Sequence, residues 1–169
     1  VNPAHNLHRA RRKNHSTQVM CGVNRRAYFD YEILETYEAG IEMLGHEVKK
    51  IKTGHINLVG SFAVIRNGEA WLLSATIPPY QSKNVTTKYE PTRSRRLLLH
   101  KSEIKELIGK SAQKGLTIIP LKVYTKRGKI KILIGLAKHK KNKDKREIIK
   151  KRESQREVER ETKGDDRLR

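Results

Sequence analysis

Sustained apolar patterning is confined to the middle of this 169-residue chain, and this limits what the chain can fold into. Val, Ile, Leu and aromatic residues recur throughout residues 28–136, whereas residues 1–27 and 137–169 contain few of them. Lys and Arg outnumber Asp and Glu by 6, 8 and 6 in segments 1–27, 28–136 and 137–169. We therefore predict one small core flanked by basic ends that cannot bury enough surface to fold alone.

The middle segment carries two hairpin signals. Alternating stretches at 61–67 and 69–75 meet at Asn67-Gly68, and stretches at 116–125 and 129–138 meet at Arg127-Gly128. Such dipeptides between alternating runs are typical of tight hairpin turns.

Other parts of the middle segment predict a third strand region and two helices. An aromatic and β-branched stretch beginning at Tyr28 predicts a strand that ends near Gly40. Apolar spacings of three and four predict helices over 45–52 and about 99–109, and residues 78–96 have the composition of an irregular loop.

This element order predicts a mainly β protein with small helices, in which five or six antiparallel strands close into an OB-like barrel. Closure is favoured over an open sheet because it leaves no exposed strand edge. The first hairpin should be lined by Ala63, Ile65, Ala70 and Leu72. The domain organisation that follows is a basic flexible arm at 1–23, the barrel at 24–137 and a basic tail at 138–169.

The tail combines helical charge spacing with little apolar surface. A spacing of four is shared by Arg152, Arg156 and Arg160 and by Glu153, Glu157 and Glu161. Ion pairs at helical spacing stabilise an isolated helix only weakly. We therefore expect the tail to be disordered when free and helical when a polyanion neutralises its arginines. A solvated run of charges is the alternative.

The formal net charge of +20 favours a polyanionic partner, because clustered Lys and Arg gain affinity by releasing counterions condensed on phosphate. Nucleic acid is the favoured class, and an anionic membrane surface is the alternative. No apolar run approaches the roughly 18 residues of a membrane-spanning helix. The single cysteine, Cys21, and the lack of a secretory signal pattern predict a reducing, intracellular compartment.

Motifs for catalysis and metal binding are missing from the sequence. His46-Glu47 lacks the second histidine of a zincin, since Lys50 stands in its place. His5, His8 and His15 have neither Cys nor an acid nearby, and no phosphate-binding glycine loop is present. We therefore expect no enzyme activity, no cofactor and no metal.

Seven short motifs occur in order between about Asn24 and Arg160. They are Asn24-Arg25-Arg26-Ala27-Tyr28, Glu38-Ala39-Gly40-Ile41, Gly45-His46-Glu47-Val48-Lys49, Leu97-Leu98-Leu99-His100, Lys114-Gly115-Leu116-Thr117, Pro120-Leu121-Lys122-Val123-Tyr124 and Asp144-Lys145-Arg146. In these motifs the chain resembles the SsrA-binding protein (small protein B) family, the partner of transfer-messenger RNA (tmRNA) in bacterial trans-translation. The resemblance implies an OB-like barrel that binds the tRNA-like domain of tmRNA. It also implies a tail that folds in the decoding site and empty mRNA channel of a stalled ribosome.

The resemblance further implies roles for particular residues. Candidates for binding tmRNA are Glu38, Leu98 and Lys131, joined by Arg25, Arg26 and Lys49 from the matching motifs. Candidates for ribosome contact in the tail are Lys138, Lys140, Lys141, Asp144, Lys145, Arg146, Lys150 and Arg152. Lys143 stands where some members carry His or Tyr, which predicts an electrostatic contact in place of stacking on a base.

Several of these residues also have a structural interpretation. Leu98 lies in a run of three leucines, where a hydrophobic residue usually belongs to the core. Glu38 at a strand end commonly hydrogen-bonds a neighbouring loop; as an RNA-binding residue it is expected to orient a basic partner or to accept from a base or ribose hydroxyl. Lys131 alternates with Ile130 and Ile132 and should therefore point outward. Packing is the default for Trp71 and Tyr124, with stacking on a base as the alternative.

The implied partners are tmRNA and the small-subunit decoding region with its ribosomal RNA. Elongation factor Tu and alanyl-tRNA synthetase are implied indirectly, through tmRNA. We expect a monomeric, cytoplasmic bacterial protein, with an organellar origin left open by the Arg-rich, acid-free lead. Three other functions stay open: a general OB-type binder of single strands, an RNA-processing enzyme and a structural ribosomal protein.

Overall fold

The computed structural model describes residues 18–79 and 89–165. Within them the elements follow in the order β1 (Val19–Val23), α1 (Arg25–Asp30), β2 (Tyr31–Ile41), α2 (Gly45–Lys52), β3 (Phe62–Arg66), β4 (Glu69–Leu73), β5 (Arg95–Leu98), α3 (Lys101–Ser111), β6 (Leu116–Lys126), β7 (Lys129–His139) and α4 (Asn142–Asp165). No helix in these two ranges is long and apolar enough to cross a membrane.

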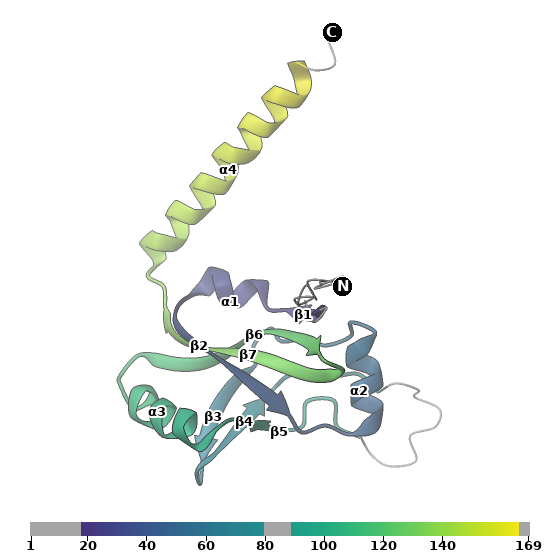
Figure 1. Cartoon of the computed structure of the whole chain (residues 1–169). Coiled ribbons are helices and arrows are strands. Elements are labelled where there is room, and N and C mark those ends of the chain that lie inside the picture. The colour runs from purple at the N-terminus through teal and green to yellow at the C-terminus, as the bar shows by residue number, and fades with distance from the viewer. Residues whose placement is uncertain (1–17, 80–88, 166–169) are drawn as a thin grey trace, which may run out of the picture.

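Six of the strands close into an antiparallel barrel. The strands neighbour one another in the order β6, β3, β4, β5, β2 and β7, and β7 pairs back onto β6. β1 lies outside this ring and pairs with β6 over Lys122–Thr125. The predicted OB-like closed barrel with small helices is confirmed, and Figure 1 shows α1, α2 and α3 arranged around it.

Strand alternation fills the barrel interior with aliphatic side chains. On β7 the residues Ile130, Ile132, Ile134 and Leu136 are all buried. On the first hairpin Ala63, Ala70 and Leu72 are buried, and Ile65 packs against the same cluster, as predicted. Burial of apolar surface at about 25 cal/mol per Å² makes this cluster the main source of stability.

Both predicted hairpin turns are present. Asn67 and Gly68 have φ angles of 51° and 73°, and Arg127 and Gly128 have φ angles of 50° and 76°. Two successive positive φ angles are the signature of the tight turn whose twist matches that of the flanking strands. The register of β3 with β4 and of β6 with β7 follows directly from these two dipeptides.

The N-terminal part of the barrel differs from the sequence prediction. Tyr28 lies in the helix α1, and the strand begins only at Tyr31. Asn24 caps α1: its side chain accepts from the Ala27 amide and donates to the Leu58 and Pro120 carbonyls, at 3.0–3.1 Å. These tertiary contacts override the strand propensity of the aromatic residues.

The predicted arm and tail boundaries also shift. Val19–Val23, assigned to the arm, form β1, while residues 1–17 lie outside the described residues. At the other end, Lys138 and His139 continue β7 and pair with Glu32 and Tyr31. The helix α4 starts at Asn142 and projects away from the barrel (Figure 1). The helical form predicted for the tail is therefore present, and its dependence on a partner stays a prediction.

A buried ion network fixes α2 against the segment that leads into β5. Glu47 and Arg95 are both fully buried and lie 2.8 Å apart, and Arg93 adds a second bond of 2.6 Å to the Glu47 carboxylate. The Leu44 amide also donates to Glu47. Burial alone raises the pKa of Glu47, but these donors outweigh it and lower the pKa to about 2. Glu47 therefore stays ionised, as a buried charge with several partners can.

Candidate nucleic-acid interface

A row of residues in register crosses the outer face of four neighbouring strands, β5, β2, β7 and β6. Gly40 of β2 lies opposite Leu98 of β5 on one side and opposite Lys131 of β7 on the other. Lys131 in turn lies opposite Tyr124 of β6. Because residues in register on adjacent strands share a face, these four positions form a continuous line across the barrel wall.

An open groove of about 430 Å³ runs beside this row. We call it the RNA groove after the tmRNA-binding role that the sequence resemblance implies for Leu98 and Lys131, and its lining is Gly40, Ile41, Met43, Val48, Leu98, Gly128, Lys129, Ile130 and Lys131. Leu98 is 52% exposed there, whereas its neighbour Leu97 is buried in the core. The core position expected for Leu98 is therefore wrong, because strand alternation sends Leu97 inward and Leu98 outward.

Gly40 leaves room for the exposed leucine. A Cβ atom at position 40 would lie 3.2 Å from the Leu98 Cβ and 3.3 Å from its Cδ1. Such contacts are tighter than ordinary van der Waals packing, so a side chain at this position would displace Leu98. The glycine therefore shapes the floor of the groove.

Glu38 lies two residues before Gly40, on the same face of β2. Its carboxylate accepts from the Tyr124 hydroxyl and from Lys126 Nζ, the latter at 2.9 and 3.0 Å to its two oxygens. The Tyr124 and Lys126 donors lower the pKa of Glu38, and Lys131 adds to this through its charge. Burial and the bond to Glu38 raise the pKa of Tyr124 to about 12. Glu38 therefore orients the basic side chain of Lys126, and its charge is largely matched within the protein.

A second cluster, the tail junction, lies at the other end of the β2–β7 pair. Asp30 Oδ1 accepts from Lys145 Nζ at 2.8 Å, and Asp30 Oδ2 accepts from Arg26 Nε at 3.2 Å. The Lys140 amide donates to the Asp30 carbonyl, and the Tyr31 and His139 rings meet edge-to-face at 5.1 Å. A hollow of about 630 Å³ lies beside the junction.

The RNA groove and the tail junction are distinct surfaces. Lys131 belongs to the groove and His139 to the junction, and both lie on β7. A strand rises about 3.3 Å per residue, so these two residues are separated by about 26 Å along β7.

The structure thus divides the predicted tmRNA-binding residues into two groups. Leu98 and Lys131 line the RNA groove, and Glu38 lies two residues before Gly40 on β2. The helix α2 borders the groove through Val48, the residue before the exposed Lys49. Arg25 and Arg26 lie on α1 instead, and Arg26 belongs to the tail junction.

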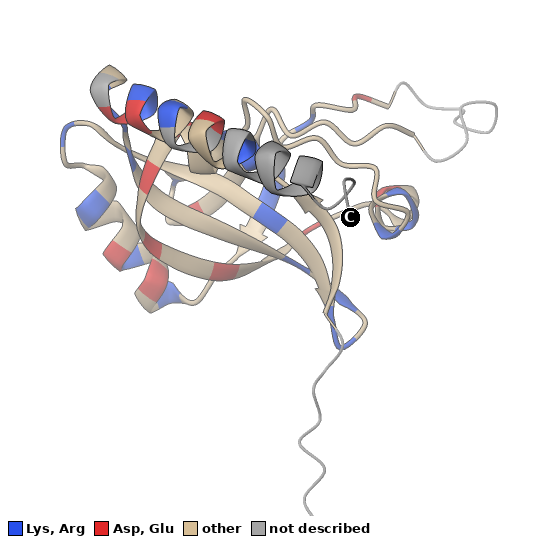
Figure 2. Cartoon of the chain, turned by 90° about the horizontal axis from the view of Figure 1, so that it is seen from above, with Lys and Arg blue, Asp and Glu red and all other residues tan. Residues whose placement is uncertain are grey.

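The predicted tail residues are divided in a similar way. Lys140 and Lys145 are partly covered by their bonds to α1, whereas the remaining described ones are exposed: Lys138, Lys141, Asp144, Arg146 and Lys150. Lys143 and Arg152 lie in α4, and their side chains lie outside the described residues. Lys, Arg, Asp and Glu are interleaved along α4 (Figure 2), so the helix presents mixed charge.

Sequence reasoning missed three residues of these surfaces. Tyr124 is buried at 3% exposure, as the packing default expected, yet its hydroxyl bonds to Glu38 across 86 residues of sequence. No functional role was predicted from the sequence for Lys126 or Asp30. Strand alternation places Glu38, Tyr124 and Lys131 on one face, but only the register of the three strands β2, β6 and β7 brings them together. Among the described residues, no group of three or more His, Cys, Asp or Glu side chains could hold a metal.

Comparison with known proteins identifies relatives over most of the chain. Residues 21–164 match the family model of the SmpB protein. The SsrA-binding protein of Thermosynechococcus vestitus is 55% identical over 137 residues, covering 81% of this chain and 90% of that protein. The SsrA-binding protein of Nostoc punctiforme is 52% identical over 148 residues, covering 88% and 95%.

A solved structure is similar as well. A chain in "tmRNA-SmpB: a journey to the center of the bacterial ribosome" superposes with a TM-score of 0.61 at 50% sequence identity, covering 72% of this chain and 85% of that one. The matched residues include both the RNA groove and the tail junction, since both lie within 21–164. The chain therefore belongs to the SmpB family of SsrA-binding proteins.

Proposed function

We propose that this protein is an RNA-binding adaptor, without catalysis of its own, that carries tmRNA to stalled ribosomes. The relatives are named as binding SsrA RNA, and the similar solved structure is described by tmRNA and the bacterial ribosome. The observation that carries the proposal on this chain is the RNA groove, which the exposed Leu98 and Lys131 line together. On the same face of β2, the Glu38 carboxylate is already paired with Lys126.

The chemistry of the groove suits structured RNA. Lys129 and Lys131 offer ammonium groups to phosphates, and Leu98 offers apolar contact to an unstacked base or a ribose face. Glu38 holds Lys126 and Tyr124 in place and leaves little net negative charge to repel phosphate. A protein that binds A-form RNA recognises mainly the shape of the RNA helix and its sugar-phosphate backbone.

The tail is proposed to act at a separate site. With the barrel bound to the tRNA-like domain, α4 would occupy the decoding site and the empty mRNA channel, where its exposed Lys and Arg meet ribosomal RNA. Elongation factor Tu and alanyl-tRNA synthetase would associate with this protein only indirectly, by binding tmRNA. Such an adaptor would act as a cytoplasmic monomer.

The test is direct binding of the full chain to three RNAs: the tRNA-like domain of tmRNA, an ordinary tRNA and an unstructured single strand, across a salt series. We expect a preference for the tRNA-like domain that survives physiological salt, with a salt slope that reports several phosphate contacts. Equal affinity for all three RNAs, fading together with salt, would contradict the adaptor function and favour general single-strand binding.

Two matched variant pairs locate the binding surface. Lys131→Ala should weaken binding and reduce the salt slope by about one, while Lys105→Ala on exposed α3 should change neither. Leu98→Ala should weaken binding with little change in salt slope, while Ile108→Ala, at a similarly exposed site on α3, should be neutral. Equal effects within each pair would show that the RNA binds elsewhere.

A further inference from the structure

The base of the tail is tied to the barrel through one carboxylate. Both Asp30 oxygens are engaged: Oδ1 by Lys145 Nζ of α4 at 2.8 Å and Oδ2 by Arg26 Nε of α1 at 3.2 Å. The side chains of Lys145 and Asp30 are only 18% and 19% exposed. This ion pair is therefore better shielded from water and salt than an ordinary surface pair.

Main-chain bonds hold the same junction. The Lys140 amide donates to the Asp30 carbonyl at 2.9 Å, and Lys140 Nζ donates to the Tyr28 carbonyl at 3.0 Å. These bonds place the end of β7 beside α1, but they stop two residues before α4 begins. The Asp30–Lys145 pair reaches further, from α1 into the first turn of α4 itself.

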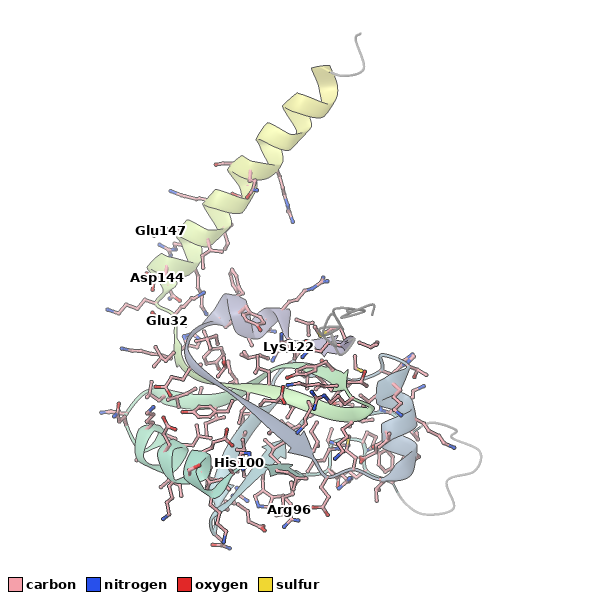
Figure 3. All side chains as sticks on the ribbon, in the orientation of Figure 1. Glu32, Arg96, His100, Lys122, Asp144 and Glu147 are labelled. Atoms are coloured by element: carbon pink, nitrogen blue, oxygen red, sulfur yellow. The ribbon has the colours of Figure 1, made fainter. Side chains whose placement is uncertain are left out.

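The three residues Asp144-Lys145-Arg146 differ in where they point. Asp144 and Arg146 are exposed, whereas Lys145 is turned back toward α1. Figure 3 shows Asp144 and Glu147 at the base of α4, above Glu32 of the barrel. A ribosomal RNA could reach Asp144 and Arg146 directly, but would have to break the Asp30 pair to engage Lys145.

We propose that Asp30 is a positioning residue that sets the direction in which the tail helix leaves the barrel, by holding Lys145. The Lys145 side chain then acts within the protein, and its exposed neighbours make the contacts outside. An α-helix of 24 residues spans about 36 Å at 1.5 Å per residue, so a small change of angle at its base moves its far end by many ångströms. The role in ribosome rescue rests on the function proposed above, whereas the geometric role does not.

The geometric test measures the tail direction in the full chain. Spin labels at Ser102→Cys on α3 and Ser154→Cys on α4, in a Cys21→Ser background, report the distance distribution by pulsed electron spin resonance. We expect a narrower distribution for the parent than for Asp30→Lys, because the Asp30–Lys145 pair orders the base of α4 even while the rest of the tail fluctuates, and an ammonium group at position 30 would repel Lys145 and Arg26. The exchange Asp30→Lys with Lys145→Asp should restore the narrower distribution, since the pair is re-formed with its charges reversed.

Glu32→Lys is the matched control, with the same change of charge two residues away at an exposed position on β2. It should leave the distribution unchanged. Thermal unfolding of each variant shows that the barrel is folded, and Asp30→Asn replaces Asp30→Lys if the latter does not fold. An unaltered distribution in both Asp30 variants, or failure of the exchange to restore the parent distribution, would overturn the proposal.

Peptide tagging on stalled ribosomes is the functional readout. Asp30→Lys should lower tagging several-fold at tmRNA concentrations that saturate the protein, and the charge exchange should recover it. Recovery of the distance distribution without recovery of tagging would overturn the positioning role of Lys145 in rescue. Absence of tagging in the parent itself would instead refute the proposed function and leave the geometric result standing.

Discussion

Gly40 is the residue on which the shape of the RNA groove depends most. It is the common register partner of Leu98 and Lys131, and its missing side chain leaves the space that the Leu98 side chain occupies. Its φ angle is not among the positive ones, so a larger residue at position 40 meets a steric conflict and no backbone strain. Substitution of Gly40 should therefore change the shape of the groove and leave the backbone of β2 unstrained.

Gly40→Ala is expected to weaken binding of the tRNA-like domain while changing the free energy of unfolding little. The new Cβ pushes against an exposed leucine that can move into solvent, which costs less than overpacking a core. Affinity measurement and urea unfolding separate the two effects. Gly109→Ala, at an open position on α3, is the control, and equal affinity for the two variants would contradict this account of Gly40.

Glu47 should make stability depend on pH in the acid range. Its pKa is about 2 in the folded protein against an ordinary 4.5, so between these values the unfolded chain binds a proton that the folded chain does not. The stabilisation is full above about pH 4.5 and is lost as the pH falls toward 2. Glu47→Gln should lower the free energy of unfolding at pH 7 by about 3–5 kcal/mol and flatten this acid dependence.

Urea unfolding at pH 7 and pH 3 measures both effects. Glu42→Gln is the control: Glu42 pairs with Arg96, but both side chains are well exposed, so the change should stay within about 0.5 kcal/mol. An acid dependence of Glu47→Gln as steep as that of the parent would show that other carboxylates cause it.

Residue-level prediction from the sequence succeeded where local rules decide and failed where tertiary contacts decide. Lys131 points outward between Ile130 and Ile132, as alternation predicted. Leu98 was expected in the core because a run of three leucines does not show which of them point inward. That is decided only when β5 pairs with β4 and β2. Glu47 was noted only within a failed zinc motif and a family motif, and its ion network was not predicted, since its arginines lie 46 and 48 residues away.

At the scale of elements, the border between barrel and tail lies in β7. The predicted boundary of 137/138 cuts through this strand, since Lys138 and His139 pair with β2 and Lys138 also with β6. Deletion of 142–169 should leave the melting temperature and the affinity for the tRNA-like domain nearly unchanged while abolishing peptide tagging. Deletion of 138–169 should in addition lower the melting temperature. Calorimetry and binding distinguish the two, and a large loss of RNA affinity on removing only 142–169 would refute the division of labour.

Elements with a local signal were predicted and those without one were not. The hairpins at Asn67-Gly68 and Arg127-Gly128 and the helices α2 and α3 were found within about two residues of their bounds. The six-residue α1 was missed because its stability comes from Asn24, whose partners are Leu58 and Pro120. The strand β1 was missed because its partner β6 lies about a hundred residues further along the chain.

At the scale of the whole molecule, stability should be distributed unevenly. β2, β6 and β7 pair along most of their lengths and surround the core, whereas α4 has few apolar residues and projects from the barrel. Native-state hydrogen exchange should therefore show amides of these strands exchanging only by global unfolding, and amides of α4 exchanging many orders of magnitude faster. Binding to the ribosome should slow exchange in α4. Protection of free α4 equal to that of the strands would contradict the view that the tail needs a partner.

Barrel closure by its last two strands has a consequence for biosynthesis. The pairings of β1 and β3 with β6, and the long pairing of β2 with β7, cannot form until those last strands have been synthesised. A nascent chain that ends before residue 126 is therefore an open sheet with unpaired edges. The tail is synthesised after β7, so its synthesis gives the barrel strands time to emerge and close.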